Sequence, residues 1–270
     1  MLMDTHCHLD ASEFDTDRRA VIDRARSQGV RAIVIPAVRR GNFAAVRELA
    51  RSFDGGCYAL GIHPLYVPQA QWSDLDALRA AVRDSMDDAR FVAIGEIGLD
   101  FFVPELTGPA MREKQEAFYQ AQLDVAREFE LPVLLHVRRS QDRLLKYLRQ
   151  RPVQGGIAHA FNGSFQQAGQ FIDHGFALGL GGAMTFERAL RIRRLATRLA
   201  LENLVLETDA PDISPEWLCS PGRVAERNEP CQVGRIASVL AQLRGETVRE
   251  IARATADAAC RVLPRLAGNL

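Results

Sequence analysis

The sequence has no net charge and no long apolar run, and each absence excludes a class of protein. Its 34 basic side chains are balanced by 34 acidic ones, so bulk electrostatics would not hold the chain on nucleic acid. An enzyme that contacts a few phosphates locally stays open. No apolar stretch reaches the length of a membrane span, and the first residues lack the basic and apolar regions of a signal peptide. We therefore expect a cytoplasmic protein that does not bind a membrane.

Cysteine is scarce as well. The chain has five cysteines, an odd number, and no Cys-x-x-Cys pair. Cys219 and Cys231 are close in sequence, but their spacing fits no standard zinc pattern. Reduced thiols in a cytoplasmic protein are the simplest interpretation.

A Gly-rich phosphate fingerprint is also missing after the first apolar run, which argues against a doubly wound open sheet. Short apolar runs alternate instead with helical periodicity. We expect strands within 1–10 and at 31–37, 58–63, 91–95, 133–136, 156–159, 176–180 and 204–207. Helices are expected at 15–28, 42–53, 75–86, 110–130, 140–149, 165–174 and 188–199.

Eight strands, most of them followed by a helix, predict a (β/α)8 TIM barrel. The length of 270 residues is near the size typical of that fold. Two further helices, at 232–243 and 248–262, would cover the outside of the barrel. The sequence has no linker-like shift in composition and no internal repeat, so residues 1–270 are expected to form a single domain.

Five of the six histidines fall where predicted strands end, namely His6, His8, His63, His136 and His159. In an α/β barrel these ends converge on one mouth, where the active sites of this fold lie. Carboxylates follow the fourth and eighth strands at Glu96 and Asp209. His6 and His8 are two residues apart and therefore share one face of a strand. Imidazoles and carboxylates gathered in this way predict a metal site.

The motifs together resemble the TatD family of metal-dependent hydrolases. They are Asp-x-His-x-His-Leu-Asp at 4–10, Gly-Ile-His-Pro at 61–64, Gly-Glu-Ile-Gly-Leu-Asp at 95–100, His136, His159, Glu-Thr-Asp-Ala-Pro at 207–211 and Arg-Asn-Glu-Pro at 227–230. They run in the family's order along nearly the whole chain. One departure is Phe-Asn-Gly at 161–163, where many members carry Phe-Ser-Gly.

The resemblance implies a barrel with two divalent metal ions. His6 and His8 would hold the first ion together with Asp209, Glu96 would bridge both ions, and the second would be held by His136 and His159. A shared carboxylate offsets the repulsion of two cations that lie roughly 3.5–4 Å apart. The ions could be magnesium, manganese or zinc, and four imidazoles suit zinc, manganese or iron better than magnesium.

The resemblance also implies a deoxyribonuclease, often one that removes nucleotides from a DNA 3′ end as an exonuclease. We expect a monomer that acts on single-stranded DNA or on DNA 3′ ends. The cations would activate a water and neutralise charge on the attacked phosphoryl oxygens. Asp209 is expected both to bind metal and to act as the general base.

Further residues at the predicted mouth are candidates for contact with the substrate. His63 is interpreted as a contact to the substrate phosphate or an acid, in preference to a turn histidine before Pro64. Arg138 and Arg227 are candidates for phosphate binding, whereas Arg139 is expected to lie in water. Phe101 and Phe102 follow the fourth strand closely, and base stacking and loop packing explain them equally well.

Three acidic residues are expected to orient metal ligands. Glu207 lies two residues before Asp209, so its side chain shares the same face and sits deeper in the barrel. Asp10 and Asp100 are weaker candidates for the same role, because carboxylates in loops are usually solvated.

Two other classes of function remain open from the sequence. The first is a metal-dependent hydrolase of an amide or ester bond, such as that of a misacylated tRNA. The neutral charge and the lack of a basic stripe keep this alternative open. The second is a non-catalytic protein that binds metal or nucleic acid, which would not need a bridging carboxylate.

Overall fold

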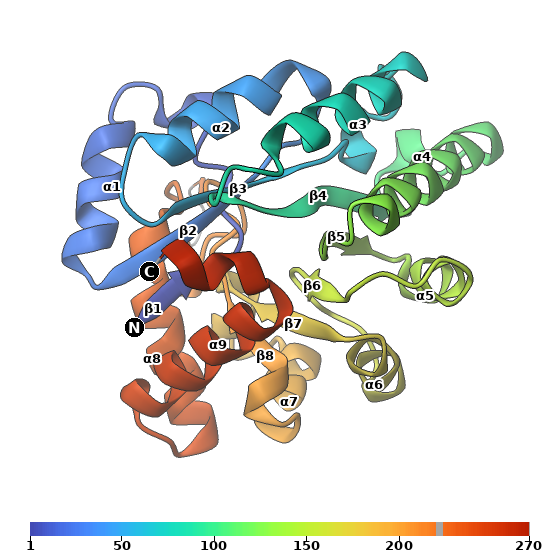
Figure 1. Ribbon diagram of the computed structural model, residues 1–270. Helices are drawn as coiled ribbons and strands as arrows, with labels where there is room; N and C mark the ends of the chain where they lie inside the picture. The colour runs from blue at the N-terminus through green and yellow to red at the C-terminus, as the bar shows by residue number, and fades with distance from the viewer. Residues whose placement is uncertain (220–223, 270) are drawn as a thin grey trace.

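The computed structural model describes residues 1–219 and 224–269, which contain eight parallel strands in one sheet (Figure 1). The strands are hydrogen-bonded in chain order from β1 to β8. They are β1 (Leu2–Asp4), β2 (Val30–Pro36), β3 (Gly56–Leu60), β4 (Phe91–Asp100), β5 (Val133–Arg138), β6 (Gly156–Ala158), β7 (Phe176–Leu180) and β8 (Leu204–Leu206). The predicted (β/α)8 barrel is confirmed.

Backbone hydrogen bonds close the sheet by joining the segments that follow β8 and β1. Leu206 O accepts from Thr5 N at 3.0 Å, and His6 O accepts from Asp209 N at 2.8 Å. One residue further on, Ala210 O accepts from His8 N at 2.8 Å. Closure therefore brings the two ends of the metal-ligand pattern, which are some 200 residues apart in sequence, to one point of the rim.

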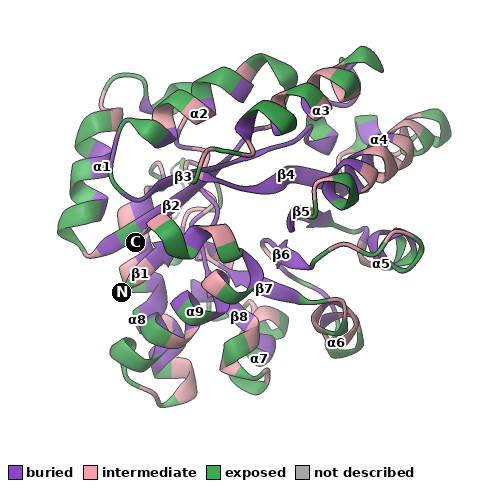
Figure 2. Ribbon diagram, viewed as in Figure 1, coloured by how far each residue is buried: buried purple, intermediate pink, exposed green. Residues whose placement is uncertain are grey.

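Helices surround the strands with their apolar faces inward, as Figure 2 shows by burial. They are α1 (Arg18–Ser27), α2 (Phe43–Arg51), α3 (Ser73–Ser85), α4 (Pro109–Glu128), α5 (Gln141–Gln150), α6 (Phe165–Asp173), α7 (Leu190–Arg198), α8 (Val233–Arg244) and α9 (Val248–Val262). Two of them begin at capping boxes, in which Ser164 accepts from Gln167 N and Thr247 accepts from Glu250 N. These side chains satisfy amide groups that the helix itself leaves unpaired.

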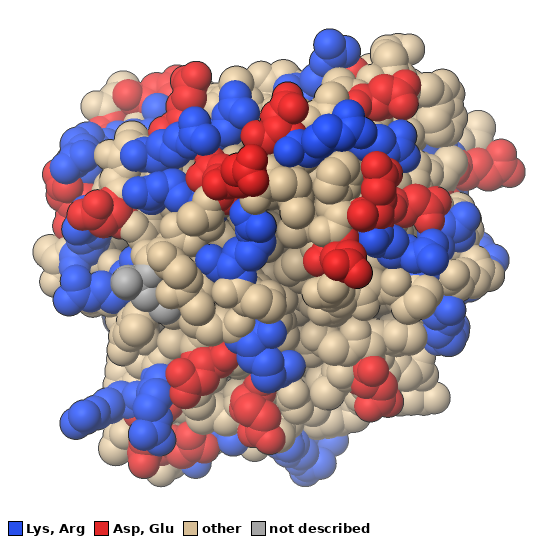
Figure 3. All heavy atoms as spheres, viewed as in Figure 1, with Lys and Arg blue, Asp and Glu red and all other residues tan. Residues whose placement is uncertain are grey.

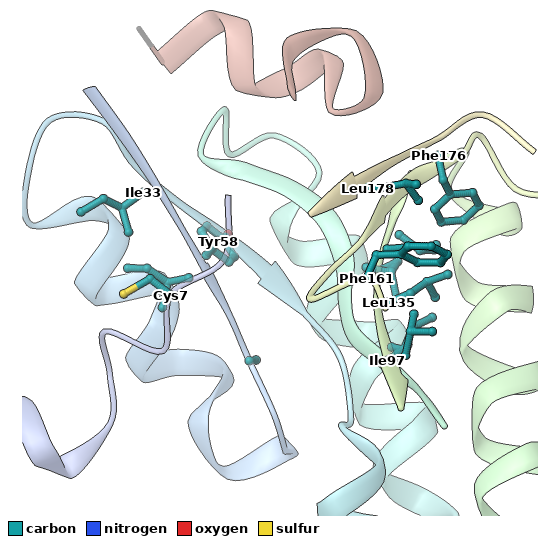
Figure 4. Close-up of a cluster of buried hydrophobic side chains, with 14 of the residues drawn as sticks. Cys7, Ile33, Tyr58, Ile97, Leu135, Phe161, Phe176 and Leu178 are labelled. Carbon is teal, nitrogen blue, oxygen red and sulfur yellow. The ribbon is translucent and has the colours of Figure 1, made fainter. Parts of the chain in front are cut away.

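Side chains alternate between the two faces of each strand, and the buried residues therefore form two hydrophobic cores. One face of the strands packs against the helices, and Figure 4 shows part of that core, with Ile33, Tyr58 and Leu135 among its side chains. The other face fills the barrel with residues such as Leu134 and Ile157. Because side chains two residues apart share a face, the residues that follow Leu134 and Ile157 on this inner face are His136 and His159. The inner face of the strands is therefore apolar inside the barrel and carries the histidines of the predicted metal site at its end.

The last helix differs from its expected position. Ala256, Ala259 and Val262 of α9 belong to the same buried cluster as the inner-face residues of the strands, together with Leu266 from the short helix Pro264–Asn269. In Figure 1 this C-terminal segment crosses in front of the barrel. Helix α9 therefore closes one end of the barrel, whereas α8 packs on its side against α7.

Strand β4 is longer than predicted. It continues from Phe91 to Asp100 because Ile97 to Asp100 pair with β5 after a register shift between Ile94 and Ile97. Among the described residues, none of the helices combines the length and the apolar character required to cross a membrane.

Candidate metal centre

Glu96 lies at the irregularity in β4 and is completely buried. Its backbone N–H donates to Ala37 O at 2.9 Å, beyond the end of β2. Gly61, just after β3, permits this arrangement, because a Cβ there would lie 2.9 Å from Glu96 O and 2.7 Å from the carbonyl carbon of Gly95. The backbone around Glu96 is thus held between three neighbouring strands.

The two carboxylate oxygens of Glu96 face different histidines. Oε2 lies 3.0 Å from His6 Nε2 and 3.4 Å from His8 Nε2. Oε1 lies 3.1 Å from His136 Nδ1 and 3.0 Å from His159 Nε2. Four predicted imidazole ligands therefore surround one carboxylate, with two on each oxygen.

Asp209 lies next to the two histidines that follow β1. Its Oδ1 lies 3.6 Å from His6 Nε2 and 3.5 Å from His8 Nε2, and this buried oxygen has no hydrogen-bond donor among the described residues. The backbone of Asp209 has a φ of 56°, a conformation that non-glycine residues adopt rarely and that is concentrated at functional sites.

The donor set fits divalent cations. His6 Nε2 and His8 Nε2 face each other at 3.4 Å, and two imidazole nitrogens aimed at one point beside carboxylate oxygens are typical of a transition-metal site. Burial alone would raise the pKa of Glu96, but the surrounding histidines hold it well below its usual value. The carboxylate is therefore ionised and able to bind a cation.

Asp100 contacts the side chain of His136. Its Oδ2 lies 3.0 Å from His136 Nε2, and this contact directs Nδ1 toward Glu96. Its Oδ1 accepts hydrogen bonds from the backbone N–H groups of Phe102 and Val103 at 2.8 and 2.9 Å. The geometry is that expected of a carboxylate that positions a metal-binding imidazole.

Glu207 lies behind His159. Its Oε1 accepts from Ala160 N at 2.5 Å and is 3.8 Å from His159 Nδ1, while Oε2 is buried without a hydrogen-bond partner among the described residues. Burial raises the pKa of Glu207 to about 8. Glu207 therefore lies deep in the barrel and next to His159, and its role in orienting that histidine stays a prediction.

His63 points into the cluster with one nitrogen and away from it with the other. Its Nε2 lies 3.0 Å from His136 Nδ1 and 3.3 Å from Glu96 Oε1. Its Nδ1 accepts a hydrogen bond from Leu65 N at 3.1 Å, so a neutral ring carries its proton on Nε2. Burial lowers the pKa of His63 to about 4, which favours the neutral ring. Nε2 is therefore a hydrogen-bond donor, in contrast to the ligand nitrogens.

Two candidates are engaged elsewhere. Asp10 accepts from Asn42 Nδ2 at 2.8 Å and hydrogen-bonds to none of the histidines among the described residues. The guanidinium of Arg227 binds both carboxylate oxygens of Asp17 at 2.8 Å and Glu229 Oε1 at 2.8 Å. Because its donors are used within the protein, the structure does not support the expected phosphate contact at Arg227.

The two arginines at the end of β5 differ from Arg227 in their contacts. Arg138 is about half exposed and lies 3.8 Å from Asp100 Oδ2. Its guanidinium carbon is 4.0 Å from the ring centroid of Phe102, and that of Arg139 is 4.6 Å from the same centroid. Arg138 therefore remains at the mouth. Arg139 is exposed to solvent, as expected, and also contacts Phe102.

Sequence reasoning missed a buried link between the two ends of the site. Asp4 Oδ1 accepts from Thr208 N at 2.9 Å and its Oδ2 accepts from Thr208 Oγ1 at 2.5 Å. Thr208 O in turn accepts from Asn228 Nδ2 at 2.8 Å. The signal for Asp4 was its spacing of two residues from His6, which places both on the inner face. The role of Asn228 had no comparable signal.

Residues 3–264 match the family described as TatD related DNase. The uncharacterized metal-dependent hydrolase YjjV of Escherichia coli is 38% identical over 253 residues, which cover 93% of this chain and 93% of that protein. The crystal structure of YjjV has a TM-score of 0.89 and 36% identity, covering 97% of this chain and 98% of that chain. Human deoxyribonuclease TATDN3 is 30% identical over 273 residues, covering 98% of this chain and 95% of that protein.

Proposed function

The chain belongs to the TatD family of metal-dependent hydrolases, and we propose that it uses two divalent cations to hydrolyse phosphodiester bonds in DNA. The observation that carries the proposal is the position of Glu96. Each of its two oxygens faces two of the four imidazoles proposed as ligands, which is the arrangement required of a carboxylate shared between two cations.

His6, His8, Asp209 and Glu96 Oε2 would hold the first cation, and Glu96 Oε1, His136 and His159 the second. Bound there, the ions would supply Lewis acidity toward phosphoryl oxygens and a nucleophile at neutral pH. Zinc, manganese or iron suits this imidazole-rich set better than magnesium, although magnesium can support phosphoryl chemistry.

Asp209 is the proposed general base. Its side chain is 13% exposed, whereas that of Glu96 is not exposed at all, so Asp209 is the carboxylate of the cluster that reaches toward the mouth. A carboxylate within hydrogen-bond reach of the attacking water accepts its proton.

His63 and Arg138 are the proposed contacts to the phosphate. The Nε2–H of His63 points into the cluster and would donate to a phosphoryl oxygen as negative charge develops. Arg138 is exposed beside Asp100 and is able to offer the paired donors that suit a phosphate. The buried carboxylates Asp100 and Glu207 would orient His136 and His159, respectively.

The proposed substrate is single-stranded DNA or a DNA 3′ end, on which the protein would act as an exonuclease. The name of the human relative, deoxyribonuclease TATDN3, supports DNA as the substrate class. One chain supplies all the residues of the cluster, which supports action as a monomer. Five free thiols support a reducing compartment such as the cytoplasm.

The test combines elemental analysis with activity. Purified protein is analysed for zinc, manganese, iron and magnesium, then incubated with end-labelled single-stranded DNA and each added metal. We expect about two ions per chain and a ladder of products that shortens from the 3′ end. Intact DNA, together with cleavage of an amide or of an aminoacyl ester by the same metal-loaded protein, would overturn the proposal in favour of the alternative chemistry.

A further inference from the structure

Phe102, Arg138 and Arg139 form a cluster at the barrel mouth, here called the Phe102 cluster. Phe102 follows β4 and is 43% exposed, although it is large and apolar. The guanidinium carbons of Arg138 and Arg139 lie over its ring at 4.0 and 4.6 Å from the centroid. The cluster thus combines an exposed aromatic ring with two positive charges.

The Phe102 cluster is joined to the metal centre through one residue. Asp100 Oδ1 accepts from Phe102 N, and Asp100 Oδ2 contacts His136 Nε2 at 3.0 Å. The same Oδ2 lies 3.8 Å from the guanidinium of Arg138. On the neighbouring segment, Arg138 O accepts from Phe101 N at 2.9 Å. The ring and the first guanidinium are therefore held at a fixed position next to a ligand of the second cation.

The guanidinium groups of the Phe102 cluster have hydrogen-bond donors that the described residues do not use. Among the described residues neither Arg138 nor Arg139 donates a side-chain hydrogen bond to a protein acceptor, in contrast to Arg227, whose guanidinium is bonded to Asp17 and Glu229. A guanidinium stacked on a ring keeps its in-plane N–H groups available for a phosphate. The φ of Arg139 is 55°, and such strained conformations of non-glycine residues are concentrated at functional sites.

The balanced charge makes a local contact more important. The net charge is zero, and the face in Figure 3, which is the end of the barrel that α9 covers, mixes basic and acidic side chains. A nucleic acid would then be held by a few well-placed groups near the reacting phosphate. Aromatic rings beside arginines are the groups with which proteins bind single strands, because a base stacks on them and a phosphate pairs with the charge.

We propose that the Phe102 cluster binds the nucleotide next to the scissile phosphodiester of a single-stranded nucleic acid. The base extends the stack formed by Phe102 and the guanidinium planes. Arg139 donates to the flanking phosphate, next to the reacting phosphate that Arg138 contacts in the proposed function. The proposal rests on the function proposed above, since it assigns a subsite for that substrate. It also explains why a large aromatic side chain is exposed at the mouth.

Two measurements test the proposal on the full-length protein. The first is the affinity of the metal-loaded protein for a fluorescently labelled phosphorothioate (dT)8 strand, whose backbone resists cleavage, measured by anisotropy. The second is kcat/KM on the phosphodiester (dT)8 strand and on methyl p-nitrophenyl phosphate, a diester without a nucleobase. Phe102→Ala and Arg139→Gln should each weaken strand binding and lower kcat/KM on the strand by about 10-fold or more, because stacking of one base contributes about 5- to 150-fold. Their activity on the small diester should stay at the wild-type value.

Two further variants serve as controls. Phe102→Trp preserves an aromatic face and should retain strand binding. Arg253→Gln removes one exposed positive charge from α9, the helix that packs against the apolar filling of the barrel, and should leave both substrates unaffected.

The outcomes separate this proposal from the proposed function. Wild-type protein that cleaves the strand, with Phe102→Ala equally active on it, overturns the subsite and leaves the function intact. Equal losses of Phe102→Ala on both substrates also overturn the subsite, since they indicate a disturbed His136. If the wild type cleaves no phosphodiester, the proposed function fails, and the binding comparison alone decides whether the cluster binds single strands.

Discussion

Gly179 in β7 leaves the space that the carboxylate of Glu207 occupies. A Cβ built at position 179 would overlap Glu207 Oε2, so no larger residue fits there while Glu207 keeps its position. Gly179 lies two residues after Ala177, whose side chain is part of the apolar filling of the barrel. Because Gly179 in β7 has no side chain, the carboxylate of Glu207, which follows β8, fits beside it.

We expect Gly179→Ala to weaken metal binding. The added methyl group should push Glu207 away from Ala160 N and His159, and removal of a partner that orients a ligand typically costs 10- to 100-fold in metal affinity. Isothermal titration with zinc measures the loss. The matched control is Gly169→Ala in α6, where a Cβ meets nothing within 4 Å and alanine favours the helix. Equal affinities in the two variants would show that Glu207 does not support the site.

His63→Gln and His136→Gln should differ in metal content. The Nε2 of His63 carries a proton in the neutral ring, because its Nδ1 accepts from Leu65 N, whereas His136 directs Nδ1 at Glu96. We expect His63→Gln to retain both ions and to lose about 10- to 100-fold in kcat/KM, as for one hydrogen bond to a charged group. His136→Gln should lose one ion. Elemental analysis of His63→Gln that showed one missing ion would instead make His63 a ligand.

Asp209→Asn tests the proposed base. Asparagine preserves the shape of the side chain and still offers an oxygen to the cation, but it accepts no proton from the water. We expect kcat to fall by about 10²- to 10⁴-fold while at least one ion stays bound. Turnover and metal content are measured on the same sample. Unchanged turnover with metal bound would assign the base to another residue.

Local sequence patterns were sufficient to predict the barrel and the convergence of the ligands. A run such as Val133 to His136 indicates a strand by its composition, and the alternation of faces then places Leu134 and His136 on the same side. Because parallel strands of a barrel end at one rim, histidines at strand ends meet without further information.

Contacts between distant segments could not be predicted in the same way. The apolar face of 248–262 indicates a helix but does not distinguish the side of the barrel from its end, where α9 lies. Arg227 was a plausible phosphate ligand because its partner Asp17 is 210 residues away in sequence. The extension of β4 to Asp100 likewise depends on its pairing with β5.

Arg227→Gln should affect stability and leave substrate affinity unchanged. Arg227 connects Asp17 near α1 with Glu229 in the loop before α8, and its guanidinium also covers the ring of Phe14 at 4.6 Å. The arginine lowers the pKa of Asp17 to about 2, so the pair is fully charged above about pH 4 and its contribution to stability is lost only as the pH falls toward 2. We expect a lower Tm at pH 5 and at pH 8, with the same KM for a small phosphodiester. A raised KM without a change in Tm would show instead that Arg227 contacts the substrate.

Removal of metal should destabilise the whole barrel through Glu96. The carboxylate and the four imidazoles come from β4, β5 and the segments that follow β1 and β6, so ions bound between them would hold these parts of the barrel together. A ligand present at 100 times its Kd stabilises the folded state by about 2.7 kcal/mol. At about 2–4 °C per kcal/mol for a chain of this size, EDTA should lower the Tm by roughly 5–10 °C.

Glu96→Gln removes the shared charge and keeps the volume, and its Tm should hardly respond to EDTA. If calorimetry showed the same shift for the variant as for the wild type, the stabilising ion would have to bind elsewhere than at Glu96.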